Sequence, residues 1–152
     1  MKYRRGRHVV TSLHAHLVFV TKYRRGVLDE DATRLLHGIF QKVAADFGAQ
    51  VVECDGEDDH IHLLVEYPAT VQLSKLVNSL KGVGSRILLR DRPDIRPFAK
   101  KGLWSPSYFA ASCGGAPIEI VRNYVANQRS ATEQNSPIPP RREQTGLPGE
   151  IG

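Results

Sequence analysis

Two histidines separated by one residue, His60 and His62, stand at the start of the apolar run from Asp59 to Tyr67. In a β-strand the side chains alternate between faces, so both imidazoles would point to one side and Ile61 to the other. A pair of neutral imidazoles on one face is half of a site for a divalent metal. A histidine on a strand is also a common surface residue, so the pair needs partners from elsewhere in the chain before it defines a metal site.

Three known uses of such a pair lack their other parts here. A binuclear zinc hydrolase requires Asp-His just downstream, where this chain has Leu64-Val65-Glu66. A two-histidine phosphoesterase requires a second His-x-Ser/Thr tripeptide, which does not occur in the sequence. A zinc finger requires paired cysteines, but Cys54 and Cys113 are far apart.

Positive charge is concentrated in two regions of a chain whose net charge is +5 at pH 7 and whose pI is about 9.4. Residues 1–28 contain seven lysines and arginines and no acid. Residues 75–101 contain eight, against Asp91 and Asp94. This segregation favours a polyanionic partner, most simply nucleic acid, although solvated helix faces and a loose basic terminus have the same composition.

Length and composition indicate one soluble globular domain. The chain has 152 residues, of which 41% are hydrophobic and 24% are charged. No apolar run approaches the ~20 residues that a membrane span needs, and the N-terminus lacks the apolar segment of a signal peptide. The two cysteines fit a reducing compartment, so we expect a cytoplasmic protein with no membrane partner.

The hydrophobic periodicity predicts six elements that position these residues, in β-α-β-β-α-β order. The strands are expected at 9–20, 50–55, 60–67 and 103–113, and the helices at 29–47, closed by Gly48, and at 70–90, capped by Thr70. A four-residue turn at 56–59 would join the middle strands. This order is that of ferredoxin-like α+β folds, with an antiparallel sheet and both helices on one face. His60 and His62 would then lie on the open face, and the opposite side chains would build the core.

A further short helix is predicted from Ile118 to Gln128, after a flexible joint at Gly114-Gly115. Tyr124 and Gln128 are four residues apart and would point together. The chain beyond is rich in proline and glycine and has no periodicity. We therefore expect one domain at 1–131 and a disordered tail at 132–152.

Five motifs occur in one order between residues 8 and 130. They are His16-Leu17-Val18-Phe19 with Lys22-Tyr23-Arg24-Arg25; Asp59-His60-Ile61-His62-Leu63-Leu64-Val65; Leu80-Lys81-Gly82 with Ser85-Arg86; Leu103-Trp104-Ser105-Pro106-Ser107-Tyr108-Phe109; and Gly114-Gly115 with Asn123-Tyr124-Val125-Ala126-Asn127-Gln128. In this order they resemble the single-tyrosine HUH transposases of small bacterial insertion sequences, the insertion-sequence 200/605 type.

The resemblance implies a role for each part of the site. His60 and His62 would be the metal-binding pair, Gln128 the third protein ligand and Tyr124 the nucleophile, in a C-terminal helix added to the ferredoxin-like core. The reaction would cleave and rejoin single-stranded DNA through a 5′-phosphotyrosine intermediate with Mg²⁺ or Mn²⁺. The family acts on hairpin-containing DNA ends as a homodimer whose active sites are shared between subunits.

Charge and motif position predict that four residues contact DNA: Arg24, Arg25, Lys81 and Arg86. His16 matches the family pattern, but the sequence assigns it no role. Two other functions stay open. One is a domesticated relative that nicks or binds repeated hairpins, and the other is a non-catalytic nucleic-acid-binding module, such as an RNA-binding domain of similar β-α-β-β-α-β order, for which the strand aromatics expected for base stacking form no recognisable motif.

Overall fold

The computed structural model of the chain describes residues 4–5, 10–11, 13–112 and 124–127. The Gly114-Gly115 joint, Gln128 and the tail at 132–152 lie outside these residues, as does most of the helix expected at 118–128. Within the described ranges, no helix is long and apolar enough to cross a membrane.

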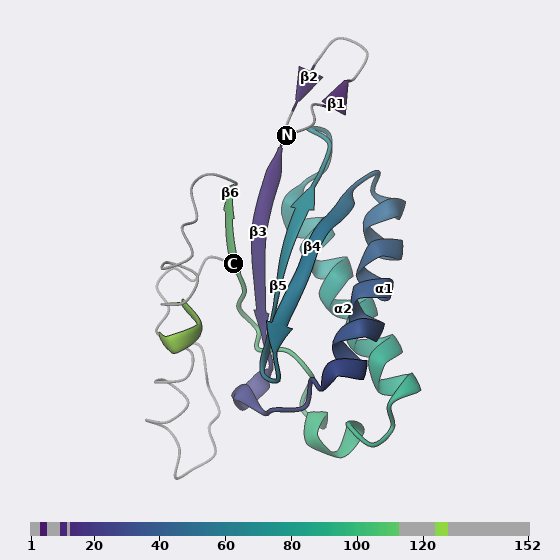
Figure 1. The fold of residues 1–152 in the computed structure, drawn as a ribbon, viewed down its shortest axis with the longest axis vertical. Coiled ribbons are helices and arrows are strands. Elements are labelled where there is room, and N and C mark those ends of the chain that lie inside the picture. Colours follow the sequence, from purple (N-terminus) through teal and green to yellow (C-terminus); the bar gives the residue numbers. More distant parts are fainter. Residues whose placement is uncertain (1–3, 6–9, 12, 113–123, 128–152) are drawn as a thin grey trace.

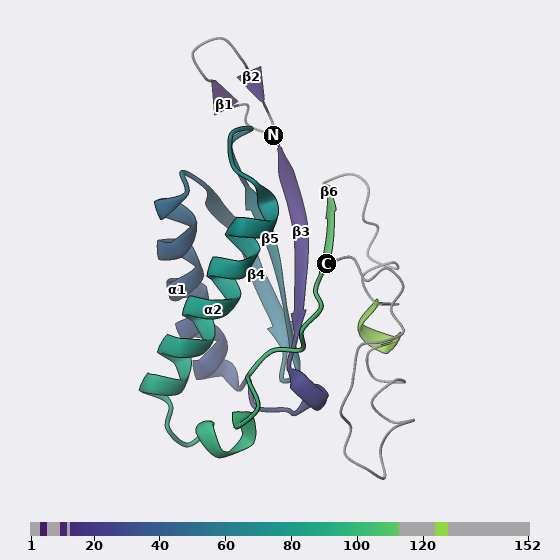
Figure 2. The ribbon, with the colours of Figure 1, turned by 180° about the vertical axis from the view of Figure 1, so that it is seen from behind.

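The main sheet is antiparallel, and its strand order is β4-β5-β3-β6. Its strands are β3 (His14–Val20), β4 (Gln50–Glu57), β5 (His60–Glu66) and β6 (Phe109–Ser112). Two helices, α1 (Glu30–Asp46) and α2 (Leu73–Asp91), lie side by side on one face of this sheet (Figures 1 and 2). Counted along the chain, the first strand of this sheet, β3, lies between the third, β5, and the fourth, β6. Ferredoxin-like folds have the same order, which confirms the expected α+β class.

The register of β3 against β5 separates the two faces of the sheet. Val18 lies opposite His62, Phe19 opposite Ile61 and Val20 opposite His60. Directly opposite residues share a face, and successive residues alternate. The two histidines therefore lie on the open face, as predicted, and Phe19 and Ile61 face the helices.

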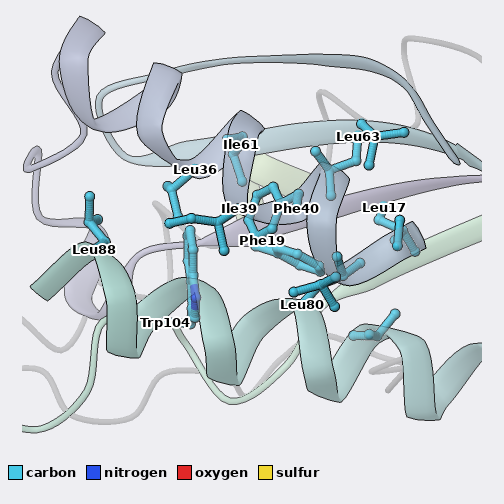
Figure 3. Packing of buried hydrophobic residues seen from close by; sticks show 14 of the residues in the cluster. Leu17, Phe19, Leu36, Ile39, Phe40, Ile61, Leu63, Leu80, Leu88 and Trp104 are labelled. Carbon is cyan, nitrogen blue, oxygen red and sulfur yellow. The ribbon is translucent and has the colours of Figure 1, made fainter. Parts of the chain in front are cut away.

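The core fills the space between the sheet and the two helices (Figure 3). Phe19 is fully buried and meets Phe40 and Trp104 edge to face, with ring centroids 5.9 and 5.7 Å apart. Burying one such side chain contributes about 1.5–3 kcal/mol. The sheet that carries the open face is thus supported from behind by a close-packed layer.

The N-terminus of α1 is capped by Asp29, whose Oδ1 accepts a hydrogen bond from the Ala32 amide at 2.8 Å. The helix ends before Gly48, which has φ +73°, a conformation that glycine adopts without strain. The expected end of this helix is confirmed.

The hairpin between β4 and β5 is tighter than predicted. Glu57 pairs with His60, so only Asp58 and Asp59 form the turn instead of the four residues expected. A register shift between Val51 and Glu53 accommodates one extra residue in β4. The short turn places Asp59 directly beside the first histidine.

The first and fourth strands are shorter in the main sheet than predicted. Val10–Thr11 forms β2, which pairs with β1 (Arg4–Arg5) in a separate two-stranded sheet. At the other end, Trp104 forms an isolated bridge with Thr21, and β6 begins only at Phe109. Pro106 has no amide hydrogen to continue the ladder between them.

Helix α2 begins at Leu73, and Gln72 is at the cap position. The prediction that Thr70 caps this helix is therefore wrong. Before the helix, the Val71 amide bonds the Pro68 carbonyl at 3.0 Å and closes a turn that contains Thr70. The buried residues of the helix are Leu76, Val77, Leu80, Gly84 and Leu88, whereas Leu73, Val83 and Ile87 are only half-buried. The loop that follows contains the short helix η2 (Arg96–Ala99).

Candidate active site on the open face of the sheet

His60 is held by its neighbour in the turn. Its Nδ1 lies 3.0 Å from Oδ1 of Asp59, and the side chain is 16% exposed. An ionised carboxylate only accepts hydrogen bonds, so Nδ1 donates, and in the neutral imidazole Nε2 then carries the lone pair. This is the form in which a histidine binds a metal.

His62 is in contact with His16 across the two central strands. His62 Nε2 lies 3.0 Å from His16 Nδ1, and the rings stack with centroids 5.2 Å apart. Burial lowers the pKa of His62, and the nearby His16 lowers it further. His62 is therefore neutral near pH 7, and His16, which the sequence left without a role, is its direct partner.

Asp59 joins His60 to Arg24. The Arg24 guanidinium donates to Asp59 Oδ2, and the two side chains are only 6% and 10% exposed. Burial by itself would raise the pKa of Asp59, but the hydrogen bond from His60 and the charge of Arg24 outweigh it and lower the pKa. Asp59 is thus an ionised carboxylate fixed at both oxygens.

Arg24 reaches Asp59 because the chain turns sharply in the short helix η1 (Lys22–Arg24). Tyr23 and Arg24 have φ +61° and +54°, a left-handed conformation that costs a non-glycine residue about 1–2 kcal/mol. The Thr21 hydroxyl donates to the Arg25 carbonyl at 2.8 Å across this turn. This hydrogen bond and the ion pair of Arg24 with Asp59 offset the conformational cost of the turn.

Three side chains in this region suit a divalent cation. Ligand atoms of Glu57, Asp59 and His60 all lie within 4.8 Å of one another. Imidazole and carboxylate together suit Mg²⁺, Mn²⁺ or Zn²⁺. His60 was predicted as a ligand, whereas Glu57 and Asp59 were not, although Asp59 stands in the motif itself.

Tyr124 lies on the same open face. Residues 124–127 are helical. The tyrosine is only 6% exposed and packs against Val18, Val20 and Phe109. Val18 and Val20 are the residues directly opposite His62 and His60. The tyrosine and the histidine pair, 62 residues apart in the sequence, are thus brought to neighbouring positions on one surface.

Ser107 is the hydroxyl partner of this tyrosine, with Oγ 3.2 Å from the Tyr124 hydroxyl. No role for this serine was predicted from the sequence. A serine in a proline-interrupted segment carries no periodic signal, so only the folded chain reveals the contact.

The four predicted DNA contacts lie in different places. Arg25 is exposed, with its guanidinium 5.6 Å from the centre of the Tyr23 ring, and Arg24 is turned inward to Asp59. Arg86 is exposed on α2, beside a groove of about 560 Å³ between α1 and α2, on the side of the sheet away from the histidines. Lys81 points its ammonium at the carbonyls of residues 105–107. DNA contact by each of the four stays a prediction.

Comparisons with known proteins show the family to which the chain belongs. The family described as "Transposase IS200 like" matches residues 9–128. The ISDra2 transposase TnpA of Deinococcus radiodurans is 28% identical over 129 residues, which covers 84% of this chain and 92% of that protein. The transposase for insertion sequence element IS200 of Salmonella typhimurium is 27% identical over 114 residues and 74% of each chain.

Two solved structures share the fold. A crystal structure of a candidate transposase from Deinococcus radiodurans R1 has a TM-score of 0.76 and 28% identity, over 82% of this chain and 97% of that one. A REP-associated tyrosine transposase bound to a REP hairpin has a TM-score of 0.51 and 14% identity, over 88% and 79% of the two chains, and shows the fold alone. With a family match that spans most of its length, this chain belongs to the IS200-like transposases.

Proposed function

We propose that this transposase cuts and rejoins single-stranded DNA at the ends of its insertion sequence, with Tyr124 as the nucleophile. The observation that carries the proposal is the packing of Tyr124 on Val18 and Val20, the cross-strand neighbours of His62 and His60. A phenol beside a pair of imidazoles and an ionised carboxylate is suited to phosphoryl transfer.

The proposed reaction exchanges one phosphate ester for another. The Tyr124 oxygen attacks the scissile phosphorus and loses its proton to solvent, while the bond to the 3′ oxygen breaks and that oxygen takes up a proton. The products are a 5′-phosphotyrosine and a free 3′-hydroxyl. Attack on that phosphotyrosine by a second 3′-hydroxyl reverses the step, releases the tyrosine and joins the strands without ATP.

The residues around His60 fit a divalent cation, and we propose Mg²⁺ or Mn²⁺. His60, Asp59 and Glu57 offer the donor atoms, with His62 beside them and Gln128 retained from the sequence as a further proposed ligand. When bound, such a cation supplies positive charge that polarises the phosphate and offsets charge developing on its oxygens. The protein's own part is to hold the two imidazoles and an ionised Asp59 in place.

Hairpin DNA and a second copy of the chain are the proposed partners. The REP-associated relative is described as bound to a REP hairpin, which supports a hairpin ligand here. The homodimer rests on the resemblance to the family. The contacts of Tyr124 with Val18, Val20 and Phe109 are within one chain, so sharing of the active site would require the tyrosine helix to exchange between subunits.

Single-stranded oligonucleotides from the flanks of the gene test this function. With Mn²⁺, the full chain should cleave one of them, leave a 3′ end that a polymerase extends, and transfer the 3′-labelled part of the oligonucleotide to the 3′-hydroxyl of a second strand. The same sequence as a perfect duplex should stay intact. Hairpin binding without cleavage would favour the binding module, and cleavage without strand transfer would favour the domesticated nickase.

A further inference from the structure

Lys81 uses one ammonium group to hold three successive backbone carbonyls. Its Nζ donates to the carbonyls of Ser105, Pro106 and Ser107 at 2.9, 3.3 and 3.4 Å. These residues lie between the Trp104 bridge and β6, outside any strand. An ammonium has three hydrogens to donate, so Lys81 can satisfy all three carbonyls where no strand partner does so.

The surroundings of Lys81 favour this internal role. Nζ lies 6.0 Å from the centre of the Phe19 ring and 5.6 Å from that of Tyr108, both within the range of a cation–π contact. The Trp104 indole donates back to the Lys81 carbonyl at 3.2 Å. Segment 104–107 is therefore tied to α2 both through the side chain of Lys81 and through its backbone.

Burial lowers the pKa of Lys81 to about 8, so the charged form still predominates at neutral pH. Removing a charge from water is costly, and a solvated lysine on this helix would avoid that cost. The carbonyls and the ring faces supply the compensation. A cation retained in such a place has a specific structural task.

Ser107 connects Lys81 to Tyr124. Ser107 accepts from Lys81 through its carbonyl and meets the Tyr124 hydroxyl through its own hydroxyl. The position of the Ser107 side chain follows from the backbone that Lys81 fixes. We propose that Lys81 is a positioning residue for Tyr124, acting through Ser107, a role that rests on the proposed function in which Tyr124 is the nucleophile.

The first test does not depend on activity. The chain has five tyrosines, so ring-¹³C-labelled tyrosine gives a simple NMR spectrum in which the Tyr124 resonance is the one missing from Tyr124→Phe. Lys81→Met and the milder Ser107→Ala should both shift this resonance. Lys42→Met, at an exposed lysine of α1, is the matched control and should leave it in place. If Lys81→Met folds and its Tyr124 resonance does not move, the inference is wrong. If Lys81→Met does not fold, an unmoved Tyr124 resonance in Ser107→Ala overturns the inference instead.

The second test separates binding from reaction. Lys81→Met and Ser107→Ala should each slow formation of the tyrosine–DNA adduct about tenfold, while the Kd for the oligonucleotide stays within twofold. The double variant should be no slower than Ser107→Ala, because Lys81 acts through that serine. Additive losses, or a loss confined to Kd, would contradict the inference and return Lys81 to the predicted DNA contacts.

The two ideas fail in different ways. An adduct that needs Tyr124 but forms at the same rate in Lys81→Met and Ser107→Ala refutes the positioning role alone. If Tyr124→Phe forms the adduct as well as the parent protein does, the proposed nucleophile is wrong. The NMR result then still decides whether Lys81 places the tyrosine.

Discussion

The Asp59 carboxylate and the His60 imidazole form a hydrogen-bonded pair, with Oδ1 and Nδ1 3.0 Å apart. The other oxygen of the same carboxylate accepts a hydrogen bond from Arg24, and Asp59 as a whole residue is only 7% exposed. His60 therefore cannot turn without breaking a buried charge network. Such a partner fixes both the tautomer and the direction of a metal-binding histidine.

Replacing Asp59 with asparagine should weaken metal binding about 10- to 100-fold. This is the usual effect of losing a carboxylate that accepts a hydrogen bond from a metal-binding histidine and so orients it. The replacement should also reduce the free energy of unfolding by about 3 kcal/mol, because Arg24 is left buried without a counter-charge. Mn²⁺ titration followed by electron paramagnetic resonance and urea unfolding measure the two effects. Asp58→Asn, at the exposed neighbour, is the control. Equal Mn²⁺ affinity in the two variants would exclude the proposed role of Asp59.

His16→Ala should not weaken metal binding. His62 Nε2 is in contact with His16, so a cation that uses this nitrogen must first displace that contact. Removing His16 should leave the Mn²⁺ affinity unchanged or raise it by up to about tenfold, the value of one hydrogen bond. His62→Ala should lower the affinity instead. If His16→Ala lowers it to the same extent, His16 is itself a ligand.

Asp29 should make a pH-dependent contribution to stability. Its hydrogen bonds from Arg92, together with the Ala32 amide, lower its pKa from 3.8 to about 2. The unfolded chain binds this proton more readily, so the stabilisation is complete above pH 3.8 and is lost as the pH falls toward 2. Because the carboxylate is 56% exposed and solvent screens the pair, Asp29→Asn should cost at most about 1 kcal/mol at pH 7.

Comparing Asp29→Asn with a further variant, Asp29→Ala, separates the cap from the ion pair at this position. Asn can still cap α1, whereas Asp29→Ala should lose about 1 kcal/mol more. Urea unfolding from pH 7 down to pH 2.5 measures the difference between the parent chain and Asp29→Asn. A difference that stays constant across this range would show that the charge of Asp29 contributes nothing.

Two glycines of α2 form a matched pair for a stability test. A Cβ at Gly84 would lie 2.9 Å from Phe40 Cε1 and 3.3 Å from Leu36 Cδ2, whereas a Cβ at Gly82 would meet nothing within 4 Å. Gly84→Ala should therefore destabilise the protein by about 1–3 kcal/mol through overpacking. Gly82→Ala should stabilise it by up to about 1 kcal/mol through helix propensity. Equal effects in urea unfolding would mean that the two helices do not pack closely at Gly84.

The sequence predicted what local periodicity controls. Alternation along β5 placed His60 and His62 opposite Ile61, and the spacing of apolar residues located α1 and most of α2. It failed where distant contacts decide. The contact of Asp59 with Arg24 depends on a strained turn at Tyr23, which has no periodic signal. The DNA contact predicted for Lys81 from its charge stays a prediction, but its bonds to the carbonyls of residues 105–107 could not be foreseen, because charge alone does not tell where a long, flexible side chain points.

Intact mass spectrometry of the protein after incubation with its single-stranded DNA end and Mn²⁺ tests the central claim most directly. We expect a species heavier by the 3′ part of the cleaved oligonucleotide, and proteolysis should locate the added mass on Tyr124. Tyr108→Phe, which changes another tyrosine of the fold, should keep the adduct, and Tyr124→Phe should abolish it. An adduct on a different tyrosine, or one that survives Tyr124→Phe, would show that Tyr124 is not the nucleophile.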